Sequence, residues 1–115
     1  MSRREGVLRR VLELQALAER EFDRGDWKAA LDAGTESIVL LRGLTPPESG
    51  TLAGALDLAA RCLLALGRAG EALPLAREAV GLSDPADDAR PSRARTLAAC
   101  RRSLDRDDGV GIQQP

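Results

Sequence analysis

The sequence contains no histidine and no tyrosine, and only 2% of its residues are aromatic. Histidine is the side chain that most often carries acid–base catalysis near neutral pH, and it is also the commonest metal ligand. The sequence has no Gly-x-Ser-x-Gly elbow and no Cys-His pairing of the kind that nucleophilic enzymes use. These absences indicate that the protein is not an enzyme, and we expect no catalytic residues, no cofactor and no metal site.

Cysteine is scarce as well. Cys62 and Cys100 stand 38 residues apart, each within a stretch rich in alanine and leucine. Because neither has a second cysteine or a histidine at metal-ligand spacing, the sequence predicts two reduced and largely buried thiols. A disulfide bond that ties the last helix to the helix around Cys62 is the alternative.

Long apolar runs are also missing. No window approaches the ~20 consecutive apolar residues that a membrane-spanning helix needs. The N-terminus is basic, but no apolar stretch of signal-peptide length follows it. We therefore expect a soluble, cytoplasmic protein without a membrane partner.

Charge is nearly balanced, with 17 basic and 18 acidic residues and a net charge of -1. No overall field therefore attracts nucleic acid or an anionic membrane. A local excess of arginine lies near the C-terminus, at positions 90, 93, 95, 101, 102 and 106. We interpret this basic patch, and Arg95, Arg101 and Arg102 in particular, as the polar outer face of an end helix. Binding of an acidic partner is an alternative, and nucleic acid is disfavoured because no aromatic residues are interleaved.

Alanine and leucine dominate the apolar residues, which favours an all-α fold. Apolar spacing of three and four residues, interrupted by glycine and proline, predicts five helices. Their approximate ranges are 4–24, 27–42, 52–66, 69–82 and 91–106, followed by a flexible tail at 107–115.

Local signals refine these helices. Asp26 is the expected N-cap of the second helix, and Ser49 or Thr51 that of the third. Gly34 lies inside the second helix, where we expect it to let a neighbouring backbone approach closely. Pro74 predicts either a kink in the fourth helix or a late start of that helix.

One seven-residue pattern occurs twice. Gly25-Asp26-Trp27-Lys28-Ala29-Ala30-Leu31 returns, altered, as Gly67-Arg68-Ala69-Gly70-Glu71-Ala72-Leu73. Each copy places a glycine between two helical patterns and an Ala-Leu pair five and six residues after it. A helix-turn-helix unit is therefore used twice, and the two copies are 42 residues apart.

This repeated unit resembles the tetratricopeptide repeat (TPR) family, whose unit is ~34 residues of paired antiparallel helices. The residues that carry the resemblance are Leu14, Leu17, Ala18, Trp27 and Ala30 in the first unit, and Leu56, Ala60, Leu63, Ala69, Ala72, Ala79 and Pro85 in the second. Glu21, Gly34 and Ala59 depart from the family pattern. The longer spacing is similar to the 42-residue variety found among kinesin-light-chain-like members.

The resemblance implies a short right-handed solenoid of stacked antiparallel helix pairs within residues 1–106. Repeat one would cover about 8–42, repeat two about 52–85, and a capping helix about 91–106. An unrelated five-helix bundle is the alternative. The resemblance also implies a concave groove for a peptide or a helix of a partner protein. The groove positions would be Leu12, Gln15, Glu19, Phe22 and Asp23 in the first unit and Asp57, Leu58, Arg61, Leu64 and Ala65 in the second.

These groove residues mix apolar and charged side chains, so we expect a ligand with apolar anchors and a basic group rather than a clamped carboxylate. Because solenoids usually need about three repeats for stability, we also expect self-association as a homodimer or a place in a larger assembly. The function predicted from the sequence is therefore a protein-binding adaptor, with an oligomerisation or regulatory module as the alternative.

Overall fold

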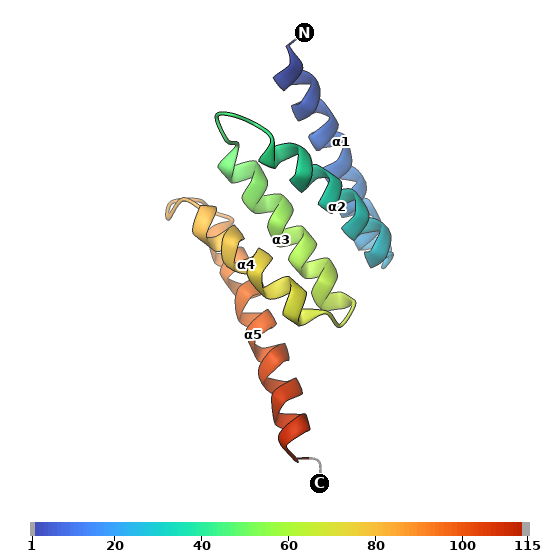
Figure 1. Ribbon diagram of the computed structural model, residues 1–115, viewed down its shortest axis with the longest axis vertical. Coiled ribbons are helices and arrows are strands. Elements are labelled where there is room, and N and C mark those ends of the chain that lie inside the picture. Colours follow the sequence, from blue (N-terminus) through green and yellow to red (C-terminus); the bar gives the residue numbers. More distant parts are fainter. Residues whose placement is uncertain (1, 114–115) are drawn as a thin grey trace.

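The computed structural model describes residues 2–113, with side chains for 2–106, and these residues form five α-helices and no strand. The helices are α1 (Arg3–Asp23), α2 (Trp27–Arg42), α3 (Ser49–Ala65), α4 (Ala69–Leu82) and α5 (Arg90–Gln113) (Figure 1). The all-α prediction with five helices is confirmed. None of the described helices has the length and the apolarity needed to cross a membrane.

Successive helices form two hairpins, α1–α2 and α3–α4, whose tight turns are built in the same way. Gly25 and Gly67 occupy the left-handed region, with φ of 83° and 78°. After each glycine, the next backbone N–H donates to a carbonyl five residues back: Asp26 to Glu21 at 2.9 Å and Arg68 to Leu63 at 2.8 Å. This is the Schellman pattern, which favours glycine because it has no Cβ.

The entry into the second helix of each hairpin differs. The Asp26 carboxylate accepts a hydrogen bond from the Ala29 N–H at 3.1 Å, so the predicted N-cap is confirmed. Its counterpart Arg68 caps no amide and instead pairs with Glu71 at 2.6 Å. Four residues after these caps, Ala30 and Ala72 are both fully buried, as expected of small residues at a helix crossing.

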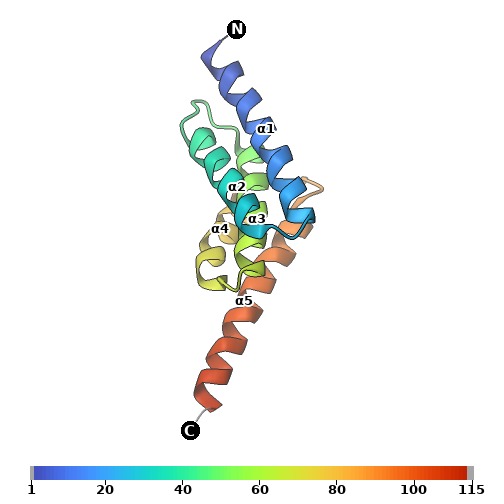
Figure 2. The same cartoon turned by 90° about the vertical axis from the view of Figure 1, so that its right-hand side faces the viewer.

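The third helix lies at the centre of the molecule. α3 contacts each of the other four helices. In Figure 2, α2 and α4 lie to one side of α3, while the ends of α1 and α5 nearest α3 lie to the other. Ten residues of α3 are buried, more than in any other helix whose buried residues are described. The core is therefore organised along α3.

Every helix buries residues at a spacing of three and then four positions, including Ala30, Ala33 and Ser37 in α2 and Ala69, Ala72 and Ala76 in α4, as expected of one buried helix face. The sets in α1, α3 and α5 differ in polarity. These sets are Val11, Leu14 and Ala18 in α1, Ala53, Leu56 and Ala60 in α3, and Arg93, Thr96 and Cys100 in α5. The first two sets are apolar, whereas the third is largely polar. α5 therefore buries two polar side chains, Arg93 and Thr96, in addition to Cys100, which packs with Ala60, Leu63, Ala72 and Ala76.

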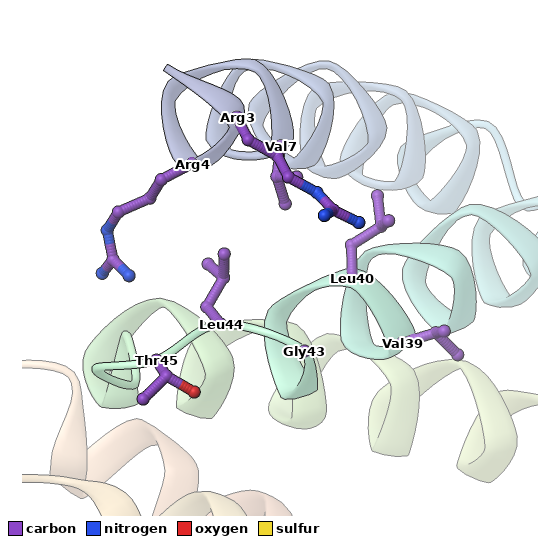
Figure 3. Close-up of a pocket in the computed structure, with 8 residues that line it drawn as sticks. All are labelled: Arg3, Arg4, Val7, Val39, Leu40, Gly43, Leu44 and Thr45. Atoms are coloured by element: carbon purple, nitrogen blue, oxygen red, sulfur yellow. The ribbon is translucent and has the colours of Figure 1, made fainter.

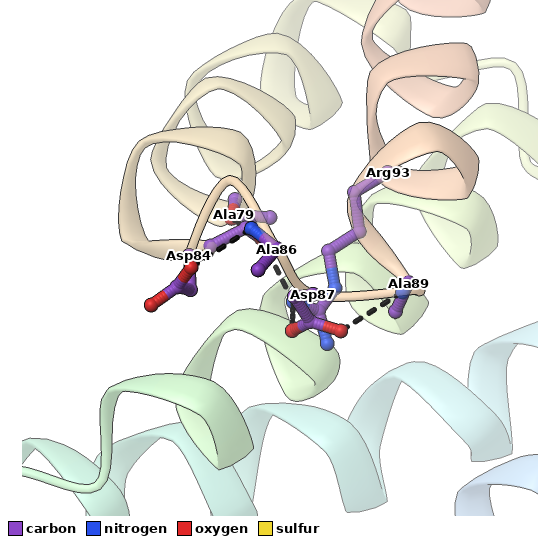
Figure 4. Close-up of polar contacts among 7 residues, drawn as sticks. Ala79, Asp84, Ala86, Asp87, Ala89 and Arg93 are labelled. Atoms are coloured by element: carbon purple, nitrogen blue, oxygen red, sulfur yellow. Dashed lines mark hydrogen bonds and ion pairs between the residues drawn. The ribbon is translucent and has the colours of Figure 1, made fainter.

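Arg93 of α5 forms hydrogen bonds with the segment that follows α4 (Figure 4). Its guanidinium Nη1 donates to the Ser83 hydroxyl at 2.8 Å and to the Asp87 carboxylate at 3.1 Å. Ser83 in turn donates to the Ala79 carbonyl at 2.7 Å, and Asp87 accepts from the Ala89 N–H at 2.8 Å. The 83–89 connection is therefore held in one conformation by a continuous set of hydrogen bonds.

Several local predictions need correction. A Cβ added to Gly34 would meet nothing within 4 Å, so no backbone approaches there. Neither Ser49 nor Thr51 caps α3, because the N-cap position is Glu48 and no side chain bonds the first turn. α4 begins at Ala69, well before Pro74, which rules out a late start.

The predicted end of α5 is wrong, whereas the predicted state of the two cysteines is confirmed. α5 continues to Gln113 rather than ending near Arg106, so residues 107–113 are helical, and residues 114–115 lie outside the described part of the chain. Figure 1 shows this end of α5 projecting beyond the other helices. Cys62 and Cys100 are both free and fully buried, as predicted.

Candidate functional site

A hollow of about 280 Å³ lies between α1 and the first half of α3. It is lined by Leu12, Gln15 and Glu19 from α1, and by Gly50, Thr51, Gly54, Ala55 and Leu58 from α3. We call it the α1–α3 hollow. Leu12 stands at its rim with 64% of its surface exposed, whereas Leu58 is buried. The lining contains one acidic residue, Glu19, and no basic residue.

Two glycines of α3 line this hollow, and a Cβ added to Gly54 would lie 3.6 Å from the Arg93 Nη2 atom of α5. Gly50 and Gly54 lie one turn apart on α3, and neither places a side chain between the two helices. The Gln15 amide donates to the Thr51 carbonyl at 3.4 Å and forms one wall. The amide oxygen of Gln15 is left as an acceptor that a bound backbone could use.

A charged cluster continues along α3 from this hollow. The Arg61 guanidinium lies over the Phe22 ring of α1, with 4.7 Å between the guanidinium carbon and the ring centroid. Arg61 also lies 3.8 Å from the Asp57 carboxylate, one turn earlier on α3. Because the ring and the carboxylate both face Arg61, its guanidinium is held at the surface between α1 and α3.

Asp57 itself is buried, with 6% of its surface exposed. Its Oδ1 atom has no hydrogen-bond partner among the described residues. Burial raises the pKa of this carboxyl, and the Thr96 hydroxyl and the guanidinium groups of Arg61 and Arg93 act in the opposite direction. Asp57 is therefore not a contact that a ligand can reach.

A second, larger hollow of about 490 Å³ lies at the other end of the first hairpin (Figure 3). It is lined by Arg3, Arg4 and Val7 from α1, Val39 and Leu40 from α2, and Gly43, Leu44 and Thr45 from the connection to α3. We call it the α2-end hollow. Leu40 and Leu44 point toward α1, and the two arginine side chains point in different directions. No sequence pattern singled out these residues.

The structure brings together part of the predicted groove. Leu12, Gln15, Glu19 and Leu58 line the α1–α3 hollow, and Phe22, Asp57 and Arg61 form the adjoining cluster. Leu64 is half-buried and packs against the cluster that contains Ala60 and Leu63. The predicted basic patch, Arg95, Arg101 and Arg102, is exposed on α5.

The exposed large apolar side chains in the described part of the chain all belong to the first hairpin. They are Leu12, Leu17, Trp27 and Val39. At the positions 42 residues later, the second hairpin has Gly54, Ala59, Ala69 and Gly81. The repeated unit therefore does not require exposed large apolar side chains at these positions, because only the first hairpin has them.

Comparisons with known proteins add no relative: no family model, no curated protein and no solved structure matches this chain. Within the described residues, no group of three or more cysteine, aspartate or glutamate side chains is placed so that it could hold a metal ion.

Proposed function

We propose that this chain is a non-enzymatic protein-interaction module, built as a short tetratricopeptide-like solenoid. In this proposal α1, α3 and α5 line a concave face that binds a peptide or a helix of a partner protein. The matching turns at Gly25 and Gly67 support the repeated unit. The contacts that α3 makes with both α1 and α5 support a face formed by these three helices.

The single observation that carries the proposal is the α1–α3 hollow with the exposed Leu12 at its rim. An exposed leucine normally gains about 1.5–3 kcal/mol when it is removed from water. Here it borders a hollow whose floor includes Ala55 and Leu58, so a partner's apolar side chain can cover all three. Such an apolar anchor with a few polar groups around it is typical of a peptide-binding site.

The charge of the α1–α3 hollow indicates which side chain of the ligand lies next to the apolar anchor. Glu19 is the only charged residue of the lining, and Asp57 is buried beyond reach. The ligand chemistry that fits is therefore a large apolar side chain next to a lysine or an arginine. Gln15, whose amide nitrogen is already bonded to Thr51, offers its oxygen to the ligand's backbone N–H.

Selection from a random peptide library on the immobilised protein tests this function. We expect enriched peptides to pair a large apolar residue with a basic one. Leu12→Ala and Glu19→Arg should each weaken their binding about five- to tenfold, which corresponds to roughly 1–1.4 kcal/mol. Val39→Ala, at an exposed apolar residue of the other hollow, is the matched control. A selection that enriches no peptide whose binding depends on Leu12 and Glu19 would contradict the proposal.

Self-association is the second candidate, and a separate observation favours it. Leu17 and Trp27 are 38% and 37% exposed, whereas their counterparts Ala59 and Ala69 are buried in the second hairpin. Ala59 packs in a cluster with Ile38 and Leu41 of α2. The same face of the first hairpin is free to receive a helix of a second copy.

Analytical ultracentrifugation distinguishes the two functions. If the chain self-associates through this face, Leu17→Lys should shift a concentration-dependent dimer to monomer and leave the folded helices intact by circular dichroism. A cooperatively folded monomer at micromolar concentration of the unmodified chain excludes the homodimer and leaves peptide binding as the function.

A further inference from the structure

The α2-end hollow has an apolar composition that the repeated unit does not require. Four of its lining residues have large apolar side chains: Val7, Val39, Leu40 and Leu44. Positions 42 residues later in the second hairpin are Ser49, Gly81, Leu82 and Ala86. Only Leu40 keeps an equivalent. The second hairpin has small or polar residues at the other three positions, so the repeated unit does not require large apolar side chains there, although Val7, Leu40 and Leu44 pack against the core of this chain.

Val39 is the clearest member of this set. It is 65% exposed, the largest exposure among the large apolar side chains described, although it lies within the last turns of α2. Leu40 and Leu44, next to it, are partly buried and pack against the main core cluster. Leu40 and Leu44 thus form a floor that packs against the core, and Val39 forms an exposed apolar rim.

The charge of the hollow is positive. Its lining contains two arginines and no acidic residue. Arg4 is neutralised from outside the lining, because it donates to the Glu48 carboxylate at 2.7 Å and to the Pro46 carbonyl at 2.9 Å. Arg3 makes no ion pair among the described residues, and Figure 3 shows its side chain directed along α1 toward Leu40. One unneutralised positive charge therefore lies beside the apolar floor.

We infer that the α2-end hollow is a second docking site, and that it binds an acidic segment of a partner protein through one large apolar side chain. The apolar side chain covers Val39, Leu40 and Leu44, and a neighbouring carboxylate pairs with Arg3. This occupant follows from the charge of the lining, which is opposite to that of the α1–α3 hollow with its single Glu19. The two sites therefore select segments of opposite charge.

Fluorescence anisotropy with three labelled peptides tests the inference. Each peptide carries the same leucine pair, flanked by glutamate, by serine or by lysine. We expect the glutamate peptide to bind the unmodified chain at least fivefold more tightly than the serine peptide, and this preference should shrink as salt is added. Arg3→Glu should remove the preference, whereas Arg9→Glu, at an exposed arginine of α1 outside the lining, should preserve it.

A second pair of variants identifies which hollow is used. Val39→Ala should weaken the glutamate peptide about fivefold, as expected when about 1 kcal/mol of apolar contact is lost. Leu12→Ala should leave it unchanged. Because both side chains are mostly exposed, neither variant threatens folding.

The outcomes are separable from those of the proposed function. A glutamate peptide that binds no better than the serine peptide, or that responds to Leu12→Ala and not to Val39→Ala, overturns the second docking site. Failure of the lysine peptide to bind at Leu12 and Glu19 counts against the proposed function alone, since it involves the other hollow and the other charge.

Discussion

Gly25 and Gly67 lie 42 residues apart and adopt the same left-handed conformation, with φ of 83° and 78°. At each glycine, the same pair of backbone hydrogen bonds to carbonyls of the preceding helix closes the C-terminal end of that helix. A residue with a Cβ is strained in this conformation by about 1–2 kcal/mol. The two hairpins thus depend on the same residue type for the same physical reason.

The first prediction follows from that strain. Gly25→Ala and Gly67→Ala should each lower the free energy of unfolding by about 1 kcal/mol. Gly34→Ala is the matched control, because Gly34 is inside α2 and an added Cβ meets nothing within 4 Å. That variant should instead raise the free energy of unfolding by roughly 0.5–1 kcal/mol. Urea denaturation measures all three, and a loss of stability in Gly34→Ala would contradict an open space at this position of α2.

The second prediction concerns the buried carboxyl of Asp57. Burial raises its pKa above the ordinary value of 3.8, so folding favours the protonated form. The stability that this group contributes is present at pH below 3.8 and is lost as the pH rises through the higher pKa of the folded state. Asp57→Asn should therefore stabilise the protein at neutral pH and lose this advantage in acid.

Thermal unfolding of both proteins across the acidic range measures the difference for Asp57. Asp32→Asn, at an exposed position of α2, is the control and should show no comparable gain. An Asp57→Asn variant that is less stable than the unmodified protein at neutral pH would mean that the ionised carboxylate is stabilised by Arg61 and Arg93 more than it is penalised by burial.

The third prediction tests how α5 is attached. Arg93→Ala removes the bonds to Ser83 and Asp87, and hydrogen bonds of this charged kind contribute about 1.5–3 kcal/mol each. We expect α5 to open more often, so that a thiol reagent alkylates the buried Cys100 at least tenfold faster. Mass spectrometry separates the two cysteines, and Cys62 on α3 is the internal control. Equal acceleration of both thiols would indicate global unfolding rather than release of α5.

The fourth prediction concerns the ion pair between the hairpins. Arg42 of α2 donates two hydrogen bonds of 2.8 Å to Glu78 of α4, and this hydrogen bonding lowers the pKa of Glu78. Both side chains are partly exposed, so the coupling energy in a double-mutant cycle should be only about 0.5–1 kcal/mol at neutral pH. It should vanish as the pH falls through the lowered pKa of Glu78. A cycle of Arg42 with Glu71, which pairs with Arg68 instead, should show no coupling at any pH.

Local chemistry explains what the sequence could predict. The turn glycines, the Asp26 cap and the five helical ranges follow from interactions within a few residues, and sequence patterns report such interactions directly. The groove positions Leu12, Gln15 and Glu19 were implied by the resemblance to the tetratricopeptide family, and the structure brings all three to one hollow.

Long-range packing explains what the sequence could not predict. Gly34 was expected at a close contact, but which face of α2 meets another backbone depends on the neighbouring hairpin. Asp57 looks like a surface residue in the sequence and is buried because α5 folds over it. The α2-end hollow joins Arg3 to Val39 and Leu44, residues about 40 positions apart that share no periodic pattern.

The central position of α3 determines how the chain can be divided. α3 contacts every other helix. A cut in the 43–48 connection therefore separates α1 and α2 from α3, and a cut in the 83–89 connection separates α5 from α3. A cut in either connection exposes surface that is buried against α3 in the whole chain. Truncation from either end should therefore reduce the cooperativity of unfolding long before α3 itself is reached, and α3 should hold the slowest-exchanging amides of the molecule.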